Sequence, residues 1–348
     1  MMGESGASAV FRFDAGPRIG GGHAMRCLTL ADEMTRSGWH CRFAVSPETS
    51  LAVPRLRPFV TDCIEITGDG DDEPSEIQGS LGGGACNLVV VDHYGRGAEF
   101  ETACRAFAER VVVIDDLADR PHDADILIDQ NLGRAPGDYS GKVPTDCGLL
   151  IGPDFALLRP EFAGRRQSVL AARKRRDGME RILVSFGMTD PLGLSLQALH
   201  VLRQICFVGH VDVVVGGMAP GIAEVHALAA EMGANVRVLS DVEDMAELMA
   251  LADIAIGAGG STSWERCAFG LPALVAVVAD NQREIAQNLA DAGAAMLVAV
   301  DGAGFRANLA GALQAFGGDA RTLRRMGEAA AGICDGQGCA RVMEALNR

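Results

Sequence analysis

The chain has 348 residues, a length that suits two α/β domains better than one, since domains typically contain roughly 100 to 200 residues. Its formal net charge of −15 argues against general attraction to nucleic acid or to an anionic membrane. The ten cysteines form no CxxC pair, which argues against a zinc cluster or a disulfide framework. No secretion signal and no bilayer-spanning apolar stretch is recognisable, so we expect a cytoplasmic protein.

Short β-branched runs alternate with amphipathic segments along the chain, a pattern typical of parallel strands joined by helices. In the first half we expect strands over residues 9–14, 41–46, 63–67, 88–92, 111–115, 125–129 and 148–152. In the second half we expect them over residues 181–186, 211–216, 235–240, 253–258 and 273–278. The pattern predicts two doubly wound α/β domains.

The domain boundaries are predicted from a break in this pattern. Residues 164–179 are basic and non-periodic, and we interpret them as a linker whose charges are solvated. The predicted division is therefore an N-terminal domain over 1–163, a second domain over 180–316, and a C-terminal helical segment over 317–348.

A glycine-rich loop follows the first predicted strand and leads into a helix. Gly20, Gly21 and Gly22 allow a ligand to approach the backbone, but their spacing does not fit the GxGxxG pattern, so we expect no nicotinamide cofactor. His23 would lie in the first helical turn, where the helix dipole favours a neutral imidazole that can take a proton from water. A histidine that only packs at the helix start is the alternative.

Other polar residues are expected at the same sheet edge. Asp14 ends the first strand and is predicted either to orient His23 or to bind a sugar hydroxyl, although a turn or cap role fits equally. Tyr94 follows the strand 88–92 and could donate to a sugar oxygen or simply occupy a turn. The carboxylates within 115–122 match no known metal-ligand spacing, so we expect no metal there.

The second half carries another strand, glycine turn and helix start. Gly259, Gly260, Ser261 and Thr262 offer main-chain N–H groups and hydroxyls to a diphosphate, and Glu265, one turn later, could accept hydrogen bonds from both hydroxyls of a ribose. The alternative is a simple capping box formed by Thr262 and Glu265.

Two further loops are predicted to reach the same cradle, because they also follow strand ends. One contains Gly187, and the other contains Asn281 and Gln282, whose amides can bind phosphate or sugar. For Asn281, a helix N-cap is the simpler alternative.

These motifs together resemble the UDP-2,4-diacetamido-2,4,6-trideoxy-β-L-altropyranose hydrolases of pseudaminic acid synthesis, the PseG family. The similar segments extend from residue 11 to about residue 282. They include RFD (12–14), IGGGHAMRCL (19–28), VDHY (91–94), IDDLADRPH (114–122), DQNL (129–132), LIGPDFALLR (150–159), SFG (185–187) and GAGGSTSWE (257–265).

The resemblance implies a GT-B architecture, in which two Rossmann-like doubly wound domains face a central cleft. It implies that water displaces UDP from the sugar with inversion and without a metal or cofactor, in a pathway to nonulosonic acids used in flagellin glycosylation. His23 would be the base, and Ser261, Thr262, Glu265 and Asn281 would hold UDP. Met188 departs from the family, which usually has glycine there.

Other functions fit the same pattern. A UDP-sugar glycosyltransferase would use an acceptor hydroxyl instead of water. A UDP-sugar 2-epimerase would eliminate UDP, and a non-catalytic protein would only bind the UDP-sugar. The oligomeric state and the exact sugar are not fixed by the sequence.

Overall fold

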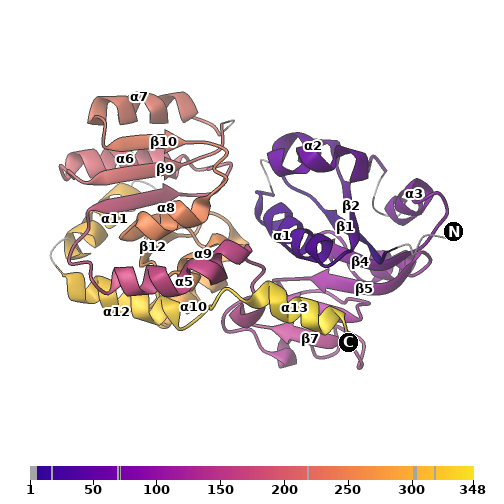
Figure 1. The fold of residues 1–348 in the computed structure, drawn as a ribbon. Helices are drawn as coiled ribbons and strands as arrows, with labels where there is room; N and C mark the ends of the chain where they lie inside the picture. Colours follow the sequence, from indigo (N-terminus) through magenta and orange to yellow (C-terminus); the bar gives the residue numbers. More distant parts are fainter. Residues whose placement is uncertain are drawn as a thin grey trace. The chain divides into compact units, whose positions relative to one another are not determined.

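The computed structural model describes residues 6–16, 19–68, 70, 72–217, 219–300, 304–316 and 319–348. Residues 1–5, where a secretion signal would begin, lie outside the described residues. The chain divides into two compact units, each with a parallel sheet (Figure 1). Unit 1 contains Met1–Leu157 and Gln337–Arg348, and unit 2 contains Leu158–Gly336.

The sheet of unit 1 has the strand order β3-β2-β1-β4-β5-β6-β7, and all its neighbours are parallel. The order reverses between β1 and β4, and Phe13 at the end of β1 is paired with Asp92 at the end of β4. Ligands bind at such a reversal in open α/β sheets. The strands are β1(Ser8–Phe13), β2(His40–Val45), β3(Cys63–Glu65), β4(Cys86–Asp92), β5(Ala108–Ile114), β6(Ile126–Asp129) and β7(Gly148–Ile151).

Apolar side chains cover both faces of this sheet, as expected for parallel strands. Along β1, Phe11 and Phe13 belong to one buried cluster and Val10 belongs to another. The helices are α1(Gly22–Arg36), α2(Pro47–Ala52), α3(Glu73–Ser80), α4(Ala98–Cys104) and α13(Gly338–Leu346), with short 3₁₀ turns η1(Pro54–Asp62), η2(Pro136–Tyr139) and η3(Pro153–Phe155).

The sheet of unit 2 has the order β10-β9-β8-β11-β12-β13, so its reversal lies between β8 and β11. Its strands are β8(Arg181–Ser185), β9(His210–Val214), β10(Val236–Leu239), β11(Ile254–Ala258), β12(Ala273–Ala276) and β13(Ala295–Leu297). Its helices are α5(Pro160–Arg173), α6(Leu194–Gln204), α7(Ile222–Met232), α8(Met245–Leu251), α9(Thr262–Ala268), α10(Arg283–Asp291), α11(Gly304–Phe316) and α12(Ala320–Ala331), with the 3₁₀ turn η4(Asp280–Gln282). Among the described helices of both units, none is long and apolar enough to cross a bilayer.

Every predicted strand is present, displaced by a few residues at most, and two doubly wound units are confirmed. The sequence analysis missed β13, a three-residue strand at the edge of unit 2. Such a short segment has no alternation that could reveal it.

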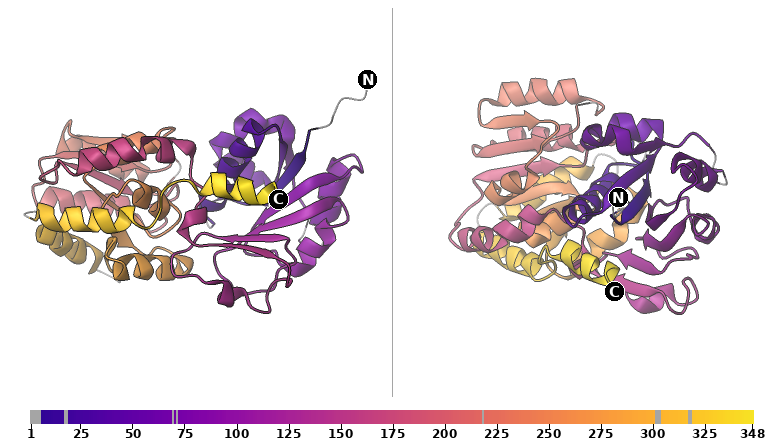
Figure 2. Two further views of the ribbon diagram at one scale, coloured as in Figure 1. Left: turned by 60° about the horizontal axis from the view of Figure 1, so that its bottom comes forward. Right: turned by 45° about the vertical axis from the view of Figure 1, so that its right-hand side comes forward.

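The predicted linker over 164–179 is wrong. Most of it lies in α5, which is part of unit 2, and the chain passes between the units at Leu157 and Leu158. The predicted C-terminal segment over 317–348 is divided, because α12 belongs to unit 2 and α13 returns to unit 1. Figure 2 shows α13, in yellow, beside the strands of unit 1.

The basic side chains of α5 are not simply solvated. The Arg173 guanidinium donates to the carbonyl oxygens of Phe269, Ala252 and Met249 at 2.6 to 2.7 Å. Arg166 likewise donates to the carbonyl of Ala331. Because these carbonyls lie at or just beyond the C-terminal ends of neighbouring helices, the arginines fasten α5 to unit 2.

Gly257 in β11 allows a test of how closely this strand packs against its neighbours in unit 2. A Cβ atom there would lie 2.3 Å from the Ser185 carbonyl oxygen and 2.9 Å from Arg266 Nη1. We expect Gly257→Ala to lower the free energy of unfolding by about 2 kcal/mol, because rigid backbone must move. Urea unfolding of Gly217→Ala is the control, since the nearest atom there is 3.9 Å away. Equal stability of the two variants would contradict the assigned packing.

Candidate functional site

The glycine loop of unit 1 brings His23 to the start of α1. Gly16 and Gly20 form an isolated antiparallel bridge, and Gly20 has a φ of +82°, which a side chain would disfavour. Gly21 is the N-cap residue of α1, and the helix begins at Gly22. His23 is therefore the second residue of α1. The His23 side chain is buried, with 6% of its surface exposed.

Asp92 holds the His23 ring. Its Oδ1 lies 2.5 Å from His23 Nδ1, and Arg26 binds the same carboxylate through Nε and Nη2, each at 2.6 Å. The Asp92 carboxylate can only accept, so its short contact places the hydrogen on Nδ1. Arg26 Nη2, at 3.2 Å from Nδ1, is then a close neighbour of that nitrogen and not its hydrogen-bond donor. In the neutral ring, Nε2 is then the nitrogen that accepts a proton.

Asp14, the residue expected to orient His23, contacts other groups. Its carboxylate accepts hydrogen bonds from Arg12, from the Ser46 main-chain N–H and from Thr49, and it contacts His93 at 3.1 Å. Burial by itself would raise the pKa of Asp14, but the bonds from His93 and Arg12 outweigh it and lower that pKa. The orienting role therefore belongs to Asp92.

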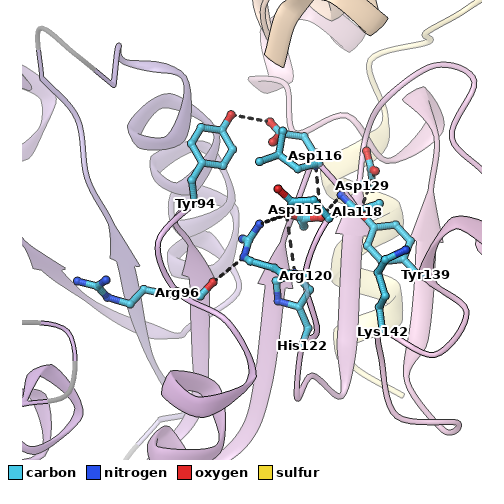
Figure 3. Close-up of polar contacts among 12 residues, drawn as sticks. Tyr94, Arg96, Asp115, Asp116, Ala118, Arg120, His122, Asp129, Tyr139 and Lys142 are labelled. Atoms are coloured by element: carbon cyan, nitrogen blue, oxygen red, sulfur yellow. Dashed lines mark hydrogen bonds and ion pairs between the residues drawn. The ribbon is translucent and has the colours of Figure 1, made fainter. Parts of the chain in front are cut away.

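Tyr94 lies against His23, as expected for a residue at this edge. The two rings meet edge to face with centroids 4.5 Å apart. The Tyr94 hydroxyl donates to Asp116 Oδ2 at 3.2 Å (Figure 3), and Arg26 Nη1 donates to the same oxygen at 3.1 Å. Asp116 was not predicted as a site residue.

The groups beside the His23 ring carry more negative than positive charge. Two carboxylates, Asp92 and Asp116, share the single guanidinium of Arg26, which leaves one negative charge while His23 is neutral. Burial alone would raise the pKa of Asp92, but Arg26 and His23 outweigh it and hold that pKa well below its usual value. The His23 ring therefore lies against a buried, ionised carboxylate.

The acidic segment 115–122 is used inside the unit. Asp115 accepts hydrogen bonds from the Ala118 main-chain N–H, from Arg120 and from Tyr139 (Figure 3). His122 pairs with Glu101 at 2.7 Å. Over the ranges that the structure describes, no group of three or more His, Cys, Asp or Glu side chains is placed so that it could hold a metal ion.

In unit 2, the predicted cradle lies between β11 and α9. The N-cap residue of α9 is Ser261, with no side-chain cap, so the capping box expected as the alternative for Thr262 and Glu265 is not formed. Packing favours glycine at position 259, because a Cβ there would make a tight contact of 3.0 Å with the Ala286 methyl group. The half-buried Gly260, Ser261 and Thr262 follow it at the helix start.

Glu265 faces a cation at the edge of this turn. Its Oε1 lies 3.7 Å from Arg159 Nη2, and 17% of its side chain is exposed. Burial raises the pKa of Glu265, and Arg159 partly offsets that effect. The Glu265 carboxylate is therefore largely buried but still partly open to solvent, where it could accept a hydrogen bond from a hydroxyl.

The other two loops are fixed mainly through the backbone. Gln282 Oε1 accepts from the Val278 main-chain N–H at 3.3 Å, whereas Asn281 is exposed. Gly187 has a φ of +95°, and the next carbonyl, that of Met188, accepts from Gly216 N–H at 3.0 Å. The loop at the Met188 departure is therefore anchored by its main chain.

Comparison with known proteins relates the chain to enzymes of nucleotide sugars. Residues 215–330 match the model of the glycosyltransferase family 28 C-terminal domain. The chain is 25% identical over 241 residues, 69% of its length and 80% of the relative, to the UDP-2,4-diacetamido-2,4,6-trideoxy-β-L-altropyranose hydrolase of Campylobacter jejuni. It is 32% identical over 163 residues to the spore coat polysaccharide biosynthesis protein SpsG of Bacillus subtilis, covering 46% of the chain and 47% of that protein.

The fold has a solved counterpart. The structure of MurG from Acinetobacter baumannii superposes with a TM-score of 0.67 over 98% of this chain and 99% of that one, at 18% identity. The chain therefore has the GT-B fold, with two doubly wound units.

The buried contacts of Asp92 lead to a stability prediction. We expect Asp92→Asn to lower the free energy of unfolding by about 3 to 5 kcal/mol, because Arg26 would remain buried without its full partner. Asp244→Asn in the exposed pair with Arg165 is the control and should change it by less than about 1 kcal/mol. Urea titrations that give similar losses for both would refute a dominant role for the buried pair.

Proposed function

We propose that the chain is a metal-independent hydrolase that removes UDP from a UDP-linked 2,4-diacetamido-2,4,6-trideoxyhexose, with inversion at the anomeric carbon. The observation that carries this proposal is the contact of Asp92 with His23 Nδ1, which leaves Nε2 available as a base. The Campylobacter relative named for this activity supports the choice of substrate.

In the proposed reaction, the water oxygen bonds to the anomeric carbon and one water proton passes to His23 Nε2. The bond from that carbon to the diphosphate oxygen breaks, and its electron pair leaves with UDP. Asp92 and Asp116 stabilise the resulting imidazolium by adding the negative charge that Arg26 alone does not balance. Tyr94, against the ring, is proposed to donate to a sugar oxygen, which requires its single hydroxyl hydrogen to turn away from Asp116 when the sugar binds.

We propose that unit 2 holds the UDP. The start of α9, with Gly259, Gly260, Ser261 and Thr262, would receive the diphosphate, and its helix dipole would stabilise the departing charge. Glu265 would accept from the ribose hydroxyls, while Gly187, Asn281 and Gln282 border the nucleotide.

A glycosyltransferase is the second candidate, favoured by the match of residues 215–330 to a glycosyltransferase domain. The same base could take the proton of an acceptor hydroxyl. Time-resolved NMR of the purified chain with the UDP-linked diacetamido sugar, and with UDP-GlcNAc beside it, separates the two. Release of UDP and free sugar from the first compound without any acceptor supports hydrolysis, whereas two inert compounds favour transfer.

His23→Ala tests the base. We expect turnover to fall by about 10² to 10⁴ while the Kd for UDP stays within about twofold, because UDP is assigned to unit 2. His40→Ala, at an exposed histidine paired with Asp62, should keep full turnover. A His23→Ala enzyme with unchanged kcat would exclude His23 as the base.

Glu265→Gln tests the ribose contact. Wild-type protein should bind UDP about 10 to 100 times more tightly than 2′-deoxy-UDP, and the variant should lose most of this preference, because a neutral amide replaces the charged acceptor. Calorimetric titration measures both ligands. Glu224→Gln, at an exposed position on α7, is the matched control and should keep the preference. An undiminished preference in Glu265→Gln would assign the ribose elsewhere.

A further inference from the structure

One tyrosine hydroxyl in unit 1 lies between two carboxylates. Tyr139 Oη is 2.9 Å from Asp115 Oδ2 and 2.9 Å from Asp129 Oδ2, and all three residues are buried (Figure 3). Asp115 follows β5, Asp129 ends β6, and Tyr139 ends η2. The three side chains thus connect adjacent strand ends to the loop beyond β6.

The hydrogens available between these oxygens do not suffice if both carboxyls are ionised. A phenol has one hydrogen and can donate to only one acceptor at full strength. Burial, together with Asp115 and Asp129, raises the pKa of Tyr139, so the phenol keeps that hydrogen. A second hydrogen on one carboxyl is needed for two good bonds, since buried oxygens in contact without a hydrogen are costly.

The hydrogen-bond donors around Asp115 and Asp129 indicate which of the two carboxyls carries the second hydrogen. Asp115 accepts from the Ala118 main-chain N–H at 2.7 Å, from Leu117 N–H at 3.3 Å and from Arg120 at 3.0 Å, a set that favours the ionised form. Asp129 accepts from Asn131 N–H and from Arg134 Nε, each at 2.8 to 2.9 Å. Burial raises the pKa of Asp129 to about 6, whereas the pKa of Asp115 is lowered.

The loop after Asp129 is also bonded to the segment beside the proposed base. Asn131 Nδ2 and Arg134 Nη2 donate to the Asp116 carbonyl oxygen at 3.0 and 3.2 Å. The side chain of Asp116 in turn contacts Tyr94 and Arg26. Hydrogen bonds to the Asp116 carbonyl, and the Asp116 residue itself, therefore connect the loop after Asp129 to the surroundings of His23.

We infer that Asp129 carries a buried proton that it donates to Tyr139, and that Asp129 in this form is a positioning residue for Asp116 next to His23. The positioning half rests on the proposed function. The protonation half does not, because it follows from the hydrogen bonds of unit 1.

The charged and titratable groups that face this proton come from the segments that follow β5 and β6. They are Asp115, Asp116, Arg120 and His122 from the segment after β5, Arg134 and Asp138 from the loop and turn after β6, and Tyr139 itself. The neighbouring strand β7 contributes no titratable side chain.

The expected pH dependence follows from the direction of the shift. The pKa of Asp129 is higher in the folded chain than the ordinary value of 3.8, so the folded state binds this proton more tightly than the unfolded state. Its stabilising contribution is complete below about pH 4 and is lost as the pH rises through about 6. Ionised Asp129 then competes with Asp115 for the single phenol hydrogen.

Carbon-13 NMR of the full chain, labelled at the aspartate carboxyl carbons, tests the protonation. We expect one carboxyl to titrate with a midpoint near pH 6, to disappear in Asp129→Asn and to persist in Asp138→Asn, whose exposed carboxyl is the control. In Asp115→Asn the midpoint should fall, because the phenol hydrogen becomes free for Asp129 and a nearby negative charge is removed. No such titration, or one that survives Asp129→Asn, would overturn the inference.

The positioning role is tested by UDP release from pH 5 to 8. We take the ratio of kcat/KM between wild type and Asp129→Asn, which cancels any pH dependence that the two enzymes share. This ratio should fall about five- to tenfold with the midpoint of the NMR titration. A ratio independent of pH would overturn the positioning role. Absence of UDP release by the wild type would refute the hydrolase while leaving the NMR result to decide the protonation.

Discussion

The buried carboxylate of Asp92 is the group on which the candidate site of unit 1 depends. It ends β4, lies next to β1 in the sheet, and contacts both His23 and Arg26, which are one helical turn apart on α1. Removing water from a carboxylate is costly unless it is paired, and the guanidinium supplies that pairing. The same contacts fasten the glycine loop and the start of α1 to the sheet, so ring orientation and local stability have one origin.

In unit 2, the candidate site depends on close packing around the turn between β11 and α9. At Gly257 the chain passes too close to the Ser185 carbonyl for a side chain, and at Gly259 a side chain would be in tight contact with Ala286. Arg266 is buried and donates to the Ala258 carbonyl and to Ser263, which fixes the turn from within. Gly257 and Gly259 therefore allow the turn to pack whether or not a ligand is bound. Only the residues that follow, Gly260, Ser261 and Thr262, are left to contact a ligand.

Much of the architecture could be predicted from the sequence because parallel, doubly covered strands are apolar runs that end in polar or glycine residues. The boundary between units could not, since the arginines of α5 resemble solvated charges unless the carbonyls they bind are known. The sequence shows Asp92 as a polar residue at the end of a strand, but it does not show that His23 is its partner. That partner depends on β4 lying beside β1, which the order of strands along the chain does not reveal.

The helix α13 belongs to unit 1 although the whole of unit 2 precedes it in the chain. Its Val342, Met343 and Leu346 are buried in the same cluster as Met34 of α1, and Gly338 lies against the main chain of Ala156. A fragment that stops at Leu157 would therefore leave the outer side of α1 uncovered and apolar. Recombinant dissection of this half needs residues 337–348 joined back by a short spacer, whereas the segment 158–336 can be excised in one piece.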